Sequence, residues 1–204
     1  MKLLASLTSP YARKIRILLA EKGIACDFEE AVPNAKDSPI PALNPLGKVP
    51  VLVRDDGSVL FDSPLILEWL DRSKSPGLIP ADGEERWQVL LWQALADGMM
   101  DASVLLMTET RRAPEHQSKT ALSHQAGKVA RAMDYANARI RGDYLVGERF
   151  SVADIALGSA LDYVDFRNPH AWREQRPTLA EWHATIAERA SFSATRPPGL
   201  VAAV

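Results

Sequence analysis

The sequence predicts a small α/β domain followed by an all-helical domain. Strand-like and helix-like segments alternate over the first 72 residues, and no convincing strand follows residue 76. A stretch rich in serine, proline and glycine separates these two parts. We therefore expect domains at residues 1–76 and 84–204, joined by a linker at residues 77–83.

The beginning of the chain predicts the order strand, helix, strand. Residues 2–7 are typical of a buried strand, and Thr8-Ser9-Pro10 then supplies an N-cap and a first-turn proline for a helix. Gly23 is placed to end that helix, and residues 28–32 predict the second strand. This order implies a parallel pair of strands with a right-handed crossover.

The remainder of the first domain predicts a hairpin and a helix. Four prolines between residues 33 and 45 favour extended and turn structure. Two short apolar runs, residues 51–53 and 59–61, flank an Asp-Gly turn signal. Asp62-Ser63-Pro64 then predicts the start of a helix that runs to Arg72.

Beyond the linker the apolar periodicity is helical. Residues 84–110 carry apolar side chains on two faces, which predicts that neighbours bury both. Residues 118–141 and 178–190 predict two further helices. The sequence from Ser151 to Asp154 predicts a capping box that begins a buried helix, and we interpret it as a folding signal without a chemical role.

Composition narrows the class of protein. The net charge of -2 offers no electrostatic case for a nucleic-acid partner. Cys26 is the single cysteine, so an internal disulfide is impossible and secretion gains no support. The apolar start of the chain is too short for a signal peptide or a membrane span. We therefore expect a cytoplasmic protein that binds neither nucleic acid nor a membrane.

Motifs for several other chemistries are missing from the sequence. The four histidines (His116, His124, His170 and His183) show no metal-ligand spacing with acidic or cysteine partners. The glycine fingerprints of phosphate and dinucleotide sites are absent, as is the nucleophile elbow of serine hydrolases. We expect no metal and no bound cofactor.

Two segments of the first domain predict a peptide-binding site. Pro50 directly precedes an apolar strand, where a proline belongs at the first residue or on an edge. If the Val49–Pro50 bond is cis, the N–H and C=O of Val49 face outward and can pair with an extended peptide. The helix that starts at Asp62-Ser63 attracts a carboxylate. Together these segments predict a site for a small peptide with a free acid group.

These residues resemble those of the cytosolic glutathione transferases, over essentially the whole chain. The resemblance is strongest at residues 44–52 with Asp62-Ser63, good at residues 8–19 and supportive at residues 151–154. It implies a thioredoxin-like N-terminal domain, an all-α C-terminal domain, glutathione as cosubstrate and a homodimer. Other members have cysteine or tyrosine near residue 9. This chain has a serine there and so resembles the serine-type bacterial members.

The resemblance also implies roles for individual residues. The implied glutathione-binding residues are Lys48, Val49, Pro50, Asp62 and Ser63. Val49 would bind the cysteinyl backbone, Lys48 would reach the glycine carboxylate, and the Asp62-Ser63 pair would hold the γ-glutamyl end. Asp62 stands where glutamate is commoner, and its side chain is shorter by one methylene group.

The expected chemistry is formation of the glutathione thiolate, the reactive form of a thiol. A helix N-terminus lowers a thiol pKa, and Ser9 stands at one, with Thr8 as the alternative donor to the sulfur. Cys26 lies after the first helix, and we interpret it as a half-buried apolar residue. This position disfavours thiol–disulfide reductase activity through a cysteine of the protein. The expected acceptor-pocket residues are Tyr11, Met107 and Phe166.

Three functions remain open at this point. The first is a glutathione transferase that acts on electrophilic substrates in detoxification, with peroxidase as a side activity. The second is a non-catalytic module of the same fold that binds glutathione or other proteins. The third is a glutathione-dependent isomerase of maleyl-type acids, which is weaker because no Ser-Ser-Cys run accompanies Ser9.

Overall fold

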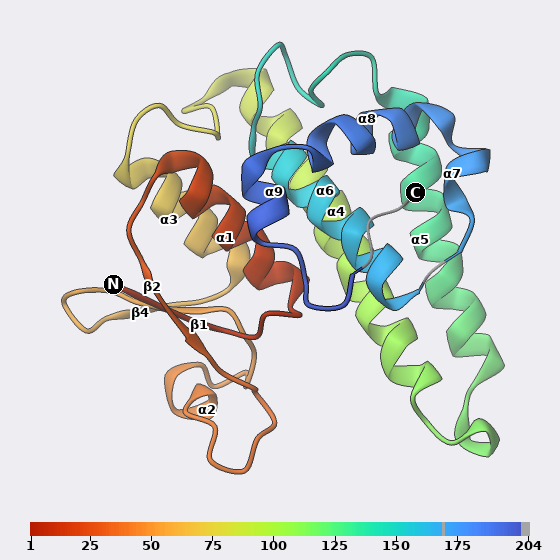
Figure 1. Cartoon of the computed structure of the whole chain (residues 1–204), viewed down its shortest axis with the longest axis horizontal. Helices are drawn as coiled ribbons and strands as arrows, with labels where there is room; N and C mark the ends of the chain where they lie inside the picture. Colours follow the sequence, from red (N-terminus) through yellow and green to blue (C-terminus); the bar gives the residue numbers. More distant parts are fainter. Residues whose placement is uncertain (169, 201–204) are drawn as a thin grey trace. The chain divides into compact units, whose positions relative to one another are not determined.

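The computed structural model describes residues 1–168 and 170–200, and these form two compact units. The first unit comprises Met1–Ala81 together with Ala190–Pro198, and the second comprises Asp82–Arg189 and the described residues from Gly199 onward. The elements of the first unit (Figure 1) are β1 (Lys2–Ala5), α1 (Pro10–Lys22), β2 (Asp27–Glu30), α2 (Ile40–Leu43), β3 (Val51–Val53), β4 (Val59–Leu60), α3 (Ser63–Ser73) and α9 (Ala190–Ala194).

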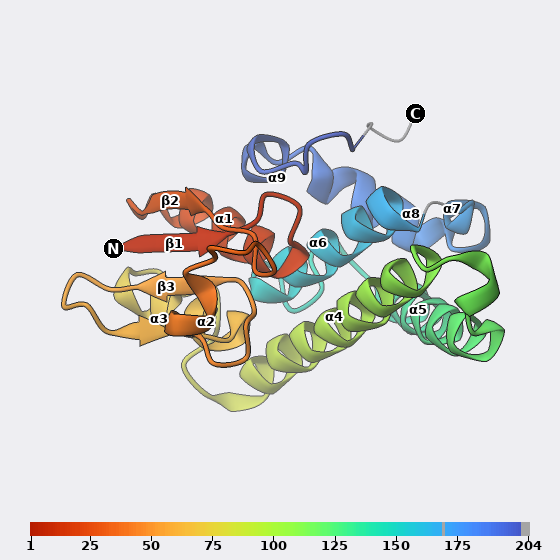
Figure 2. The same cartoon turned by 90° about the horizontal axis from the view of Figure 1, so that it is seen from below.

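The first unit contains a four-stranded mixed sheet in the order β2-β1-β3-β4. Figure 2 shows β2, β1 and β3 side by side in that order. Leu3 pairs with Phe28 in the parallel ladder and with Leu52 in the antiparallel one, and Leu52 in turn pairs with Leu60. This confirms the predicted parallel strand pair and the predicted hairpin, whose turn places Gly57 at φ 81°.

Helices α1 and α3 pack against one another, and a buried ion pair joins their C-terminal ends. Lys22 Nζ lies 2.5 Å from Asp71 Oδ1, and both side chains are almost fully buried. Asp71 also accepts hydrogen bonds from the N–H groups of Leu78 (2.7 Å) and Ile79 (2.9 Å). Removal of one partner from such a pair costs about 3–5 kcal/mol. The pair therefore holds together the two helices whose N-termini carry the predicted site residues.

The second unit is helical, as the sequence predicts. Its elements are α4 (Gly83–Thr110), a short 3-10 helix η1 (Pro114–His116), α5 (Lys119–Arg139), α6 (Val152–Arg167), α7 (Trp172–Gln175) and α8 (Pro177–Ala187). α4 packs against both α5 and α6 (Figure 1). α6 is buried over its first thirteen residues, and its capping box at Ser151 and Asp154 is formed as predicted.

Residues 190–198 belong by their contacts to the first unit, although the sequence prediction assigned them to the domain at residues 84–204. Two arginines of α1 make these contacts. Arg13 donates a hydrogen bond to the Phe192 carbonyl (3.1 Å), and Arg16 donates one to the Thr195 carbonyl (3.3 Å). No local sequence pattern predicts that the chain returns to the first unit, because the bonded residues lie 179 positions apart.

The prediction that both faces of α4 are buried is wrong for the single chain. Met99 and Met100 are buried on the core side, whereas Trp87, Leu91 and Leu105 are 66%, 50% and 52% exposed. Within the described residues α4 is also long and apolar enough to cross a membrane. α5 and α6 both pack on it, which is the arrangement of a core helix.

Candidate functional site

The Val49–Pro50 peptide bond is cis, as the peptide-binding prediction requires. Pro50 is buried immediately before β3, and Val49 is half-buried outside the ladder. Within residues 1–168 and 170–200, neither the N–H nor the C=O of Val49 has a hydrogen-bond partner. Both groups therefore remain available to an extended peptide.

Asn44 holds the turn that precedes Val49. Its side-chain amide donates to the Lys48 carbonyl (2.8 Å), and its side-chain oxygen accepts from the Leu46 N–H (3.0 Å). Asn44 is 2% exposed, and Gly47 in the same turn has φ 62°. Sequence reasoning did not single out Asn44 as a positioning residue, although an asparagine followed by proline and glycine is a turn signal.

Ser63 is the first residue of α3 and carries a buried hydroxyl group. The side chain is 1% exposed, and Ser63 Oγ has no hydrogen-bond partner among the described residues. The backbone N–H of Ser63 donates to the carboxylate of Asp62, the exposed N-cap residue. The N–H group expected to hold a ligand carboxylate is thus occupied by a protein carboxylate in the free chain.

Ser9 is the N-cap of α1, and its hydroxyl is only partly used. Ser9 Oγ accepts from the Ala12 N–H (3.3 Å), which leaves the hydroxyl hydrogen without an acceptor in the described part of the chain. The first turn of α1 contains no acidic residue, so no side chain offsets the positive end of the helix dipole. A hydrogen-bond donor at such a position is suited to stabilise a nearby anion.

Thr8 differs from Ser9 in this respect. Thr8 Oγ1 lies 3.1 Å from Ser6 Oγ, so the two hydroxyl groups form a hydrogen bond with each other. The Thr8 N–H also points to Ser6 Oγ (3.3 Å). Either hydroxyl can be the donor of this bond, so the Thr8 hydrogen is available only if Ser6 donates, whereas Ser9 Oγ accepts its bond and keeps its hydrogen in either case. Ser9 is therefore the better candidate to donate to an external sulfur.

The strand registers place these groups at one edge of the sheet. The antiparallel pairs Leu4–Val51 and Leu52–Leu60 are the last ones before the sheet ends on this side. β1 and β4 both run antiparallel to β3, so the segments that follow them, which carry Ser9 and Ser63, leave the sheet at the end where β3 begins. Val49 lies just before that beginning of β3. Ser9, Val49 and Ser63 thus gather at the edge where β1 and β4 end and β3 begins.

The other predicted site residues are dispersed. Lys48 is exposed and forms no ion pair within the described chain. Tyr11 lies half-buried in the first turn of α1, whereas Met107 and Phe166 lie half-buried in the last turns of α4 and α6. Their assembly into one acceptor pocket stays a prediction.

Cys26 is half-buried after α1, in agreement with its predicted apolar role. Burial raises the pKa of the Cys26 thiol above its ordinary value. A raised pKa lowers the fraction of thiolate at neutral pH, so Cys26 is a poor candidate for a nucleophile.

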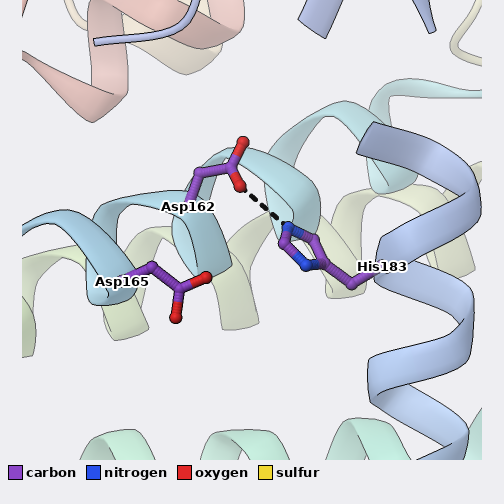
Figure 3. Close-up of side chains that lie close together, drawn as sticks. All are labelled: Asp162, Asp165 and His183. Carbon is purple, nitrogen blue, oxygen red and sulfur yellow. Dashed lines mark hydrogen bonds and ion pairs between the residues drawn. The ribbon is translucent and has the colours of Figure 1, made fainter. Parts of the chain in front are cut away.

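Asp162, Asp165 and His183 come together in the second unit as a candidate metal group (Figure 3). His183 Nε2 lies 2.9 Å from Asp162 Oδ1. Asp165 receives two bonds from Arg173 (3.0 and 2.5 Å) and one from Trp172 Nε1 (2.8 Å). The Arg173 guanidinium already supplies the positive charge that a metal ion would supply. We interpret the group as a structural network that joins α6 to α7 and α8, which sequence spacing did not reveal.

Comparison with known proteins shows the family of the chain. Residues 8–73 match the family "Glutathione S-transferase, N-terminal domain", and residues 95–190 match "Glutathione S-transferase, C-terminal domain". The uncharacterised GST-like protein YibF of Escherichia coli is 38% identical over 97% of this chain and 99% of its own length. Maleylacetoacetate isomerase of Pseudomonas aeruginosa is 30% identical over 77% of this chain and 78% of its own.

A solved structure extends the likeness to three dimensions. The glutathione S-transferase of Methylobacillus flagellatus, crystallised with glutathione bound, is 41% identical and superimposes with a TM-score of 0.93. The match covers 96% of this chain and 98% of that one. The family matches, the relatives and the fold agree, and the chain belongs to the glutathione S-transferase superfamily.

Proposed function

We propose that this protein is a glutathione transferase that binds glutathione along the sheet edge formed by Ser9, Val49 and Ser63. The observation that carries the proposal is the set of unsatisfied groups at this edge. Val49 offers a free N–H and C=O, Ser63 a buried orphan hydroxyl, and Ser9 a hydroxyl hydrogen without an acceptor. The Ser63 hydroxyl weighs most, because a buried polar group is rarely left unpaired, and the half-buried groups of Val49 and Ser9 can bind the same polar ligand.

Each part of glutathione finds a complementary group at this edge. The cysteinyl backbone pairs with Val49 as an added strand, and Lys48 is exposed for the glycine carboxylate. The γ-glutamyl carboxylate replaces the carboxylate of Asp62 at the Ser63 N–H. The Asp62 side chain, released in this way, then faces the ammonium group. The bound peptide places its thiol at the N-terminus of α1.

The Ser9 hydroxyl and the α1 dipole favour the thiolate, which lowers the pKa of the bound thiol. The thiol proton leaves to solvent, and the sulfur lone pair forms a bond to an electrophilic carbon while the leaving group departs with its bonding pair. In the peroxidase side activity, two glutathione molecules become a disulfide and the hydroperoxide becomes an alcohol and water. Such reactions would serve detoxification of electrophiles.

Binding is tested by titration calorimetry of the chain with glutathione. We expect Ser63→Ala to weaken binding by about tenfold, the equivalent of one hydrogen bond to a charged group. Ser73→Ala is the matched control, because Ser73 caps the other end of the same helix by a bond to the Leu70 carbonyl (2.7 Å). The absence of any heat of binding in the wild-type chain would overturn the proposal.

Catalysis is tested with 1-chloro-2,4-dinitrobenzene and cumene hydroperoxide. We expect Ser9→Ala to lower kcat/KM on the order of 100-fold and to raise the pKa of bound glutathione, measured by thiolate absorbance. Ser118→Ala is the matched control, because Ser118 caps α5 by an equivalent bond from the Ala121 N–H (3.2 Å). Tight binding of glutathione without turnover on any electrophile would favour the non-catalytic module instead.

Glutathione-dependent isomerisation of a maleyl-type acid is the second candidate. It is favoured by the 30% identity to maleylacetoacetate isomerase over most of both chains. The same bound thiolate would add to the cis double bond, permit rotation about the resulting single bond and leave again. Conversion of maleylacetone faster than that of chlorodinitrobenzene would make the isomerase the main activity.

We also propose that the protein is a homodimer, with the exposed apolar face of α4 as part of the contact. Trp87, Leu91 and Leu105 lie at helical spacing on this face and are half or more exposed in the single chain. Leu91→Arg should shift the sedimentation coefficient from dimer to monomer, and Val32→Arg, at an equally exposed apolar residue of the first unit, should not. A monomeric wild-type chain would contradict the proposal.

We place the protein in the cytoplasm, where glutathione is abundant. The half-buried single thiol of Cys26 needs no oxidising compartment. Fractionation of cells that express the chain would test this placement, and recovery in a membrane or periplasmic fraction would contradict it.

A further inference from the structure

One face of α5 carries a row of exposed basic side chains. The row consists of His124, Lys128, Arg131 and Arg139, and all four side chains are exposed. Their spacing along α5 is typical of residues that share one side of a helix. At 1.5 Å per residue, the row is about 22 Å long. We call these four residues the basic row.

The cations of the basic row have no acidic partner. Within residues 1–168 and 170–200, none of Lys128, Arg131 and Arg139 forms an ion pair. Asp134 is the single acidic residue of α5, and it accepts a hydrogen bond from Arg176 Nε (2.8 Å). The one carboxylate of this helix is therefore neutralised from outside the row, and the charge of the row is left uncompensated.

Folding gains nothing from this arrangement. Like charges three residues apart, such as Lys128 and Arg131, destabilise a helix slightly. Gly127 lies in the interior of α5, where glycine is less favourable than alanine. A Cβ atom at Gly127 would lie 3.2 Å from Arg131 Nη1, so the glycine leaves room for that guanidinium to lie along the helix. Two choices that are unfavourable for the helix thus preserve the row, which indicates a role other than folding.

Arg139, at the C-terminal end of the row, is held in place by aromatic contacts. Its guanidinium carbon lies 3.6 Å from the centre of the Tyr135 ring. That ring in turn meets buried Trp92 of α4 edge-on, with 5.8 Å between the ring centres. A guanidinium stacked on an aromatic face keeps the N–H groups of its edge available to a carboxylate. Arg139 therefore presents an oriented cation.

The shape and surroundings of the row distinguish between anionic partners. A single-stranded nucleic acid stacks its bases on exposed aromatic rings, whereas Arg139 covers the Tyr135 ring. A membrane surface requires apolar side chains beside the cations, and α5 has no large exposed apolar side chain among the described residues. The row is one side chain wide, and the small residues Gly127 and Ala138 lie beside it. A second helix can approach such a surface closely.

We propose that the basic row is a docking site for an acidic α-helix of another protein. Aspartate or glutamate side chains along one face of that helix pair with Lys128, Arg131 and Arg139, and His124 joins them when it is protonated. Exposed ion pairs are individually weak and are screened by salt, so the association is reversible and salt-dependent. The row shares no residue with the proposed glutathione site or with the α4 face assigned to the dimer.

The test uses two fluorescein-labelled helical peptides of about 20 residues, both built from alanine, glutamine and the same number of glutamates. In the striped peptide the glutamates form one row along the helix, and in the scattered peptide they are spread around it. Fluorescence anisotropy should show that the wild-type chain binds the striped peptide about tenfold more tightly than the scattered one. The affinity should fall as NaCl rises from about 50 to about 300 mM.

A charge reversal within the row locates the binding surface. Lys128→Glu combined with Arg131→Glu should weaken binding of the striped peptide about tenfold or more, because like charges then face one another. Lys36→Glu combined with Arg196→Glu is the matched control, since it reverses two exposed cations outside α5 and changes the net charge equally. The control should bind the peptide as the wild-type chain does, and circular dichroism should show equal helical content in all three chains.

Several outcomes would overturn the proposal. These are failure of the wild-type chain to bind the striped peptide, equal binding of the two peptides, and equal losses in the two double variants. Tighter binding of a uridine oligonucleotide or of phosphatidylserine vesicles would assign the row to a nucleic acid or a membrane instead. A change of oligomeric state on reversal of Lys128 and Arg131, measured by sedimentation, would identify a second copy of the chain as the occupant. Glutathione binding, measured on the same samples, reports on the first site separately.

Discussion

Ser9 and Ser151 both cap helices in this protein, and they use their hydroxyl groups differently. Ser151 at α6 is buried and saturated: Oγ accepts from the Ala153 N–H (3.2 Å) and donates to Asp154 Oδ2 (3.0 Å). Ser9 at α1 is half-buried, accepts only from the Ala12 N–H (3.3 Å) and has no acidic partner in the first turn. We call the Ser151 cap closed, because its hydroxyl both accepts and donates a hydrogen bond. We call the Ser9 cap open, because its hydroxyl only accepts one and retains its donor.

Under the proposed function, this difference separates a folding signal from a chemical one. Asp154 accepts hydrogen bonds from the N–H groups of Leu145 (2.9 Å) and Ser151 (2.8 Å), so the cap of α6 also fastens the preceding loop. The cap of α1 fastens only its own first turn. Its unused donor lies at the sheet edge with Val49 and Ser63, where an anionic sulfur would accept a hydrogen bond. The same residue type thus stabilises the fold at one helix and, in the proposed function, donates to the glutathione sulfur at the other.

The largest expected effect is on stability, from Asp154→Ala. This change removes the acceptor of two backbone N–H groups and one hydroxyl in a buried environment. We expect the free energy of unfolding to fall by about 3–4 kcal/mol, measured by urea denaturation. Asp143→Ala, at an exposed acid of the preceding loop, should change it little. Equal losses in the two variants would show that the α6 cap stabilises the fold no more than an exposed acid does.

A second prediction concerns pH. Burial raises the pKa of Asp154 from 3.8 to about 6, against the effect of its hydrogen bonds. The folded state therefore holds this proton more tightly than the unfolded chain. The stabilising contribution is complete below about pH 4 and is lost as pH rises through 6, by at most about 3 kcal/mol. The difference in unfolding free energy between wild type and Asp154→Asn should fall accordingly, and a difference constant from pH 4 to 7 would refute the assignment.

The sequence predicts the closed cap better than the open one. The spacing from Ser151 to Asp154 contains both partners of the capping box, so the local pattern suffices. The Ser9 hydroxyl keeps its donor because the nearby Ser6 hydroxyl forms its hydrogen bond with Thr8 and not with Ser9. The proposed role of the Ser9 hydroxyl depends on Val49 and Ser63, and only the pairing of the strands brings these residues to the same end of the sheet.

The same contrast explains which elements were missed. The strands and long helices follow from periodicity and from turn residues such as Gly23 and Gly57. The short helix α9 was missed because distant contacts with Arg13 and Arg16 place it. The network of Asp162 with His183 likewise depends on residues far apart in the sequence. Local chemistry encodes local structure, whereas these sites require the tertiary fold.

A third, smaller effect separates the two caps directly. Ser151→Ala should cost about 1–2 kcal/mol of stability, because Ala153 and Asp154 both lose a buried hydrogen bond. Ser9→Ala should cost about 0.5 kcal/mol, since its single bond is long and half-exposed. Urea unfolding and kcat/KM should rank the two variants in opposite orders. The same ranking by both measurements would contradict the division between a folding cap and a chemical one.

The smallest expected effect comes from Thr8→Ala. Its hydroxyl is paired with that of Ser6, so its loss leaves the Ser9 donor in place, and we expect kcat/KM to change by less than about twofold. Thr8→Val and Ser6→Ala, which disturb the same pair from either side, should behave alike. If Thr8→Ala instead lowers turnover strongly while Ser9→Ala does not, glutathione binding must reorient the turn so that Thr8 replaces Ser9 as the donor to sulfur. If neither variant loses activity, no side-chain hydroxyl of this turn activates the thiol, and the backbone N–H groups and dipole of α1 would have to stabilise the thiolate alone.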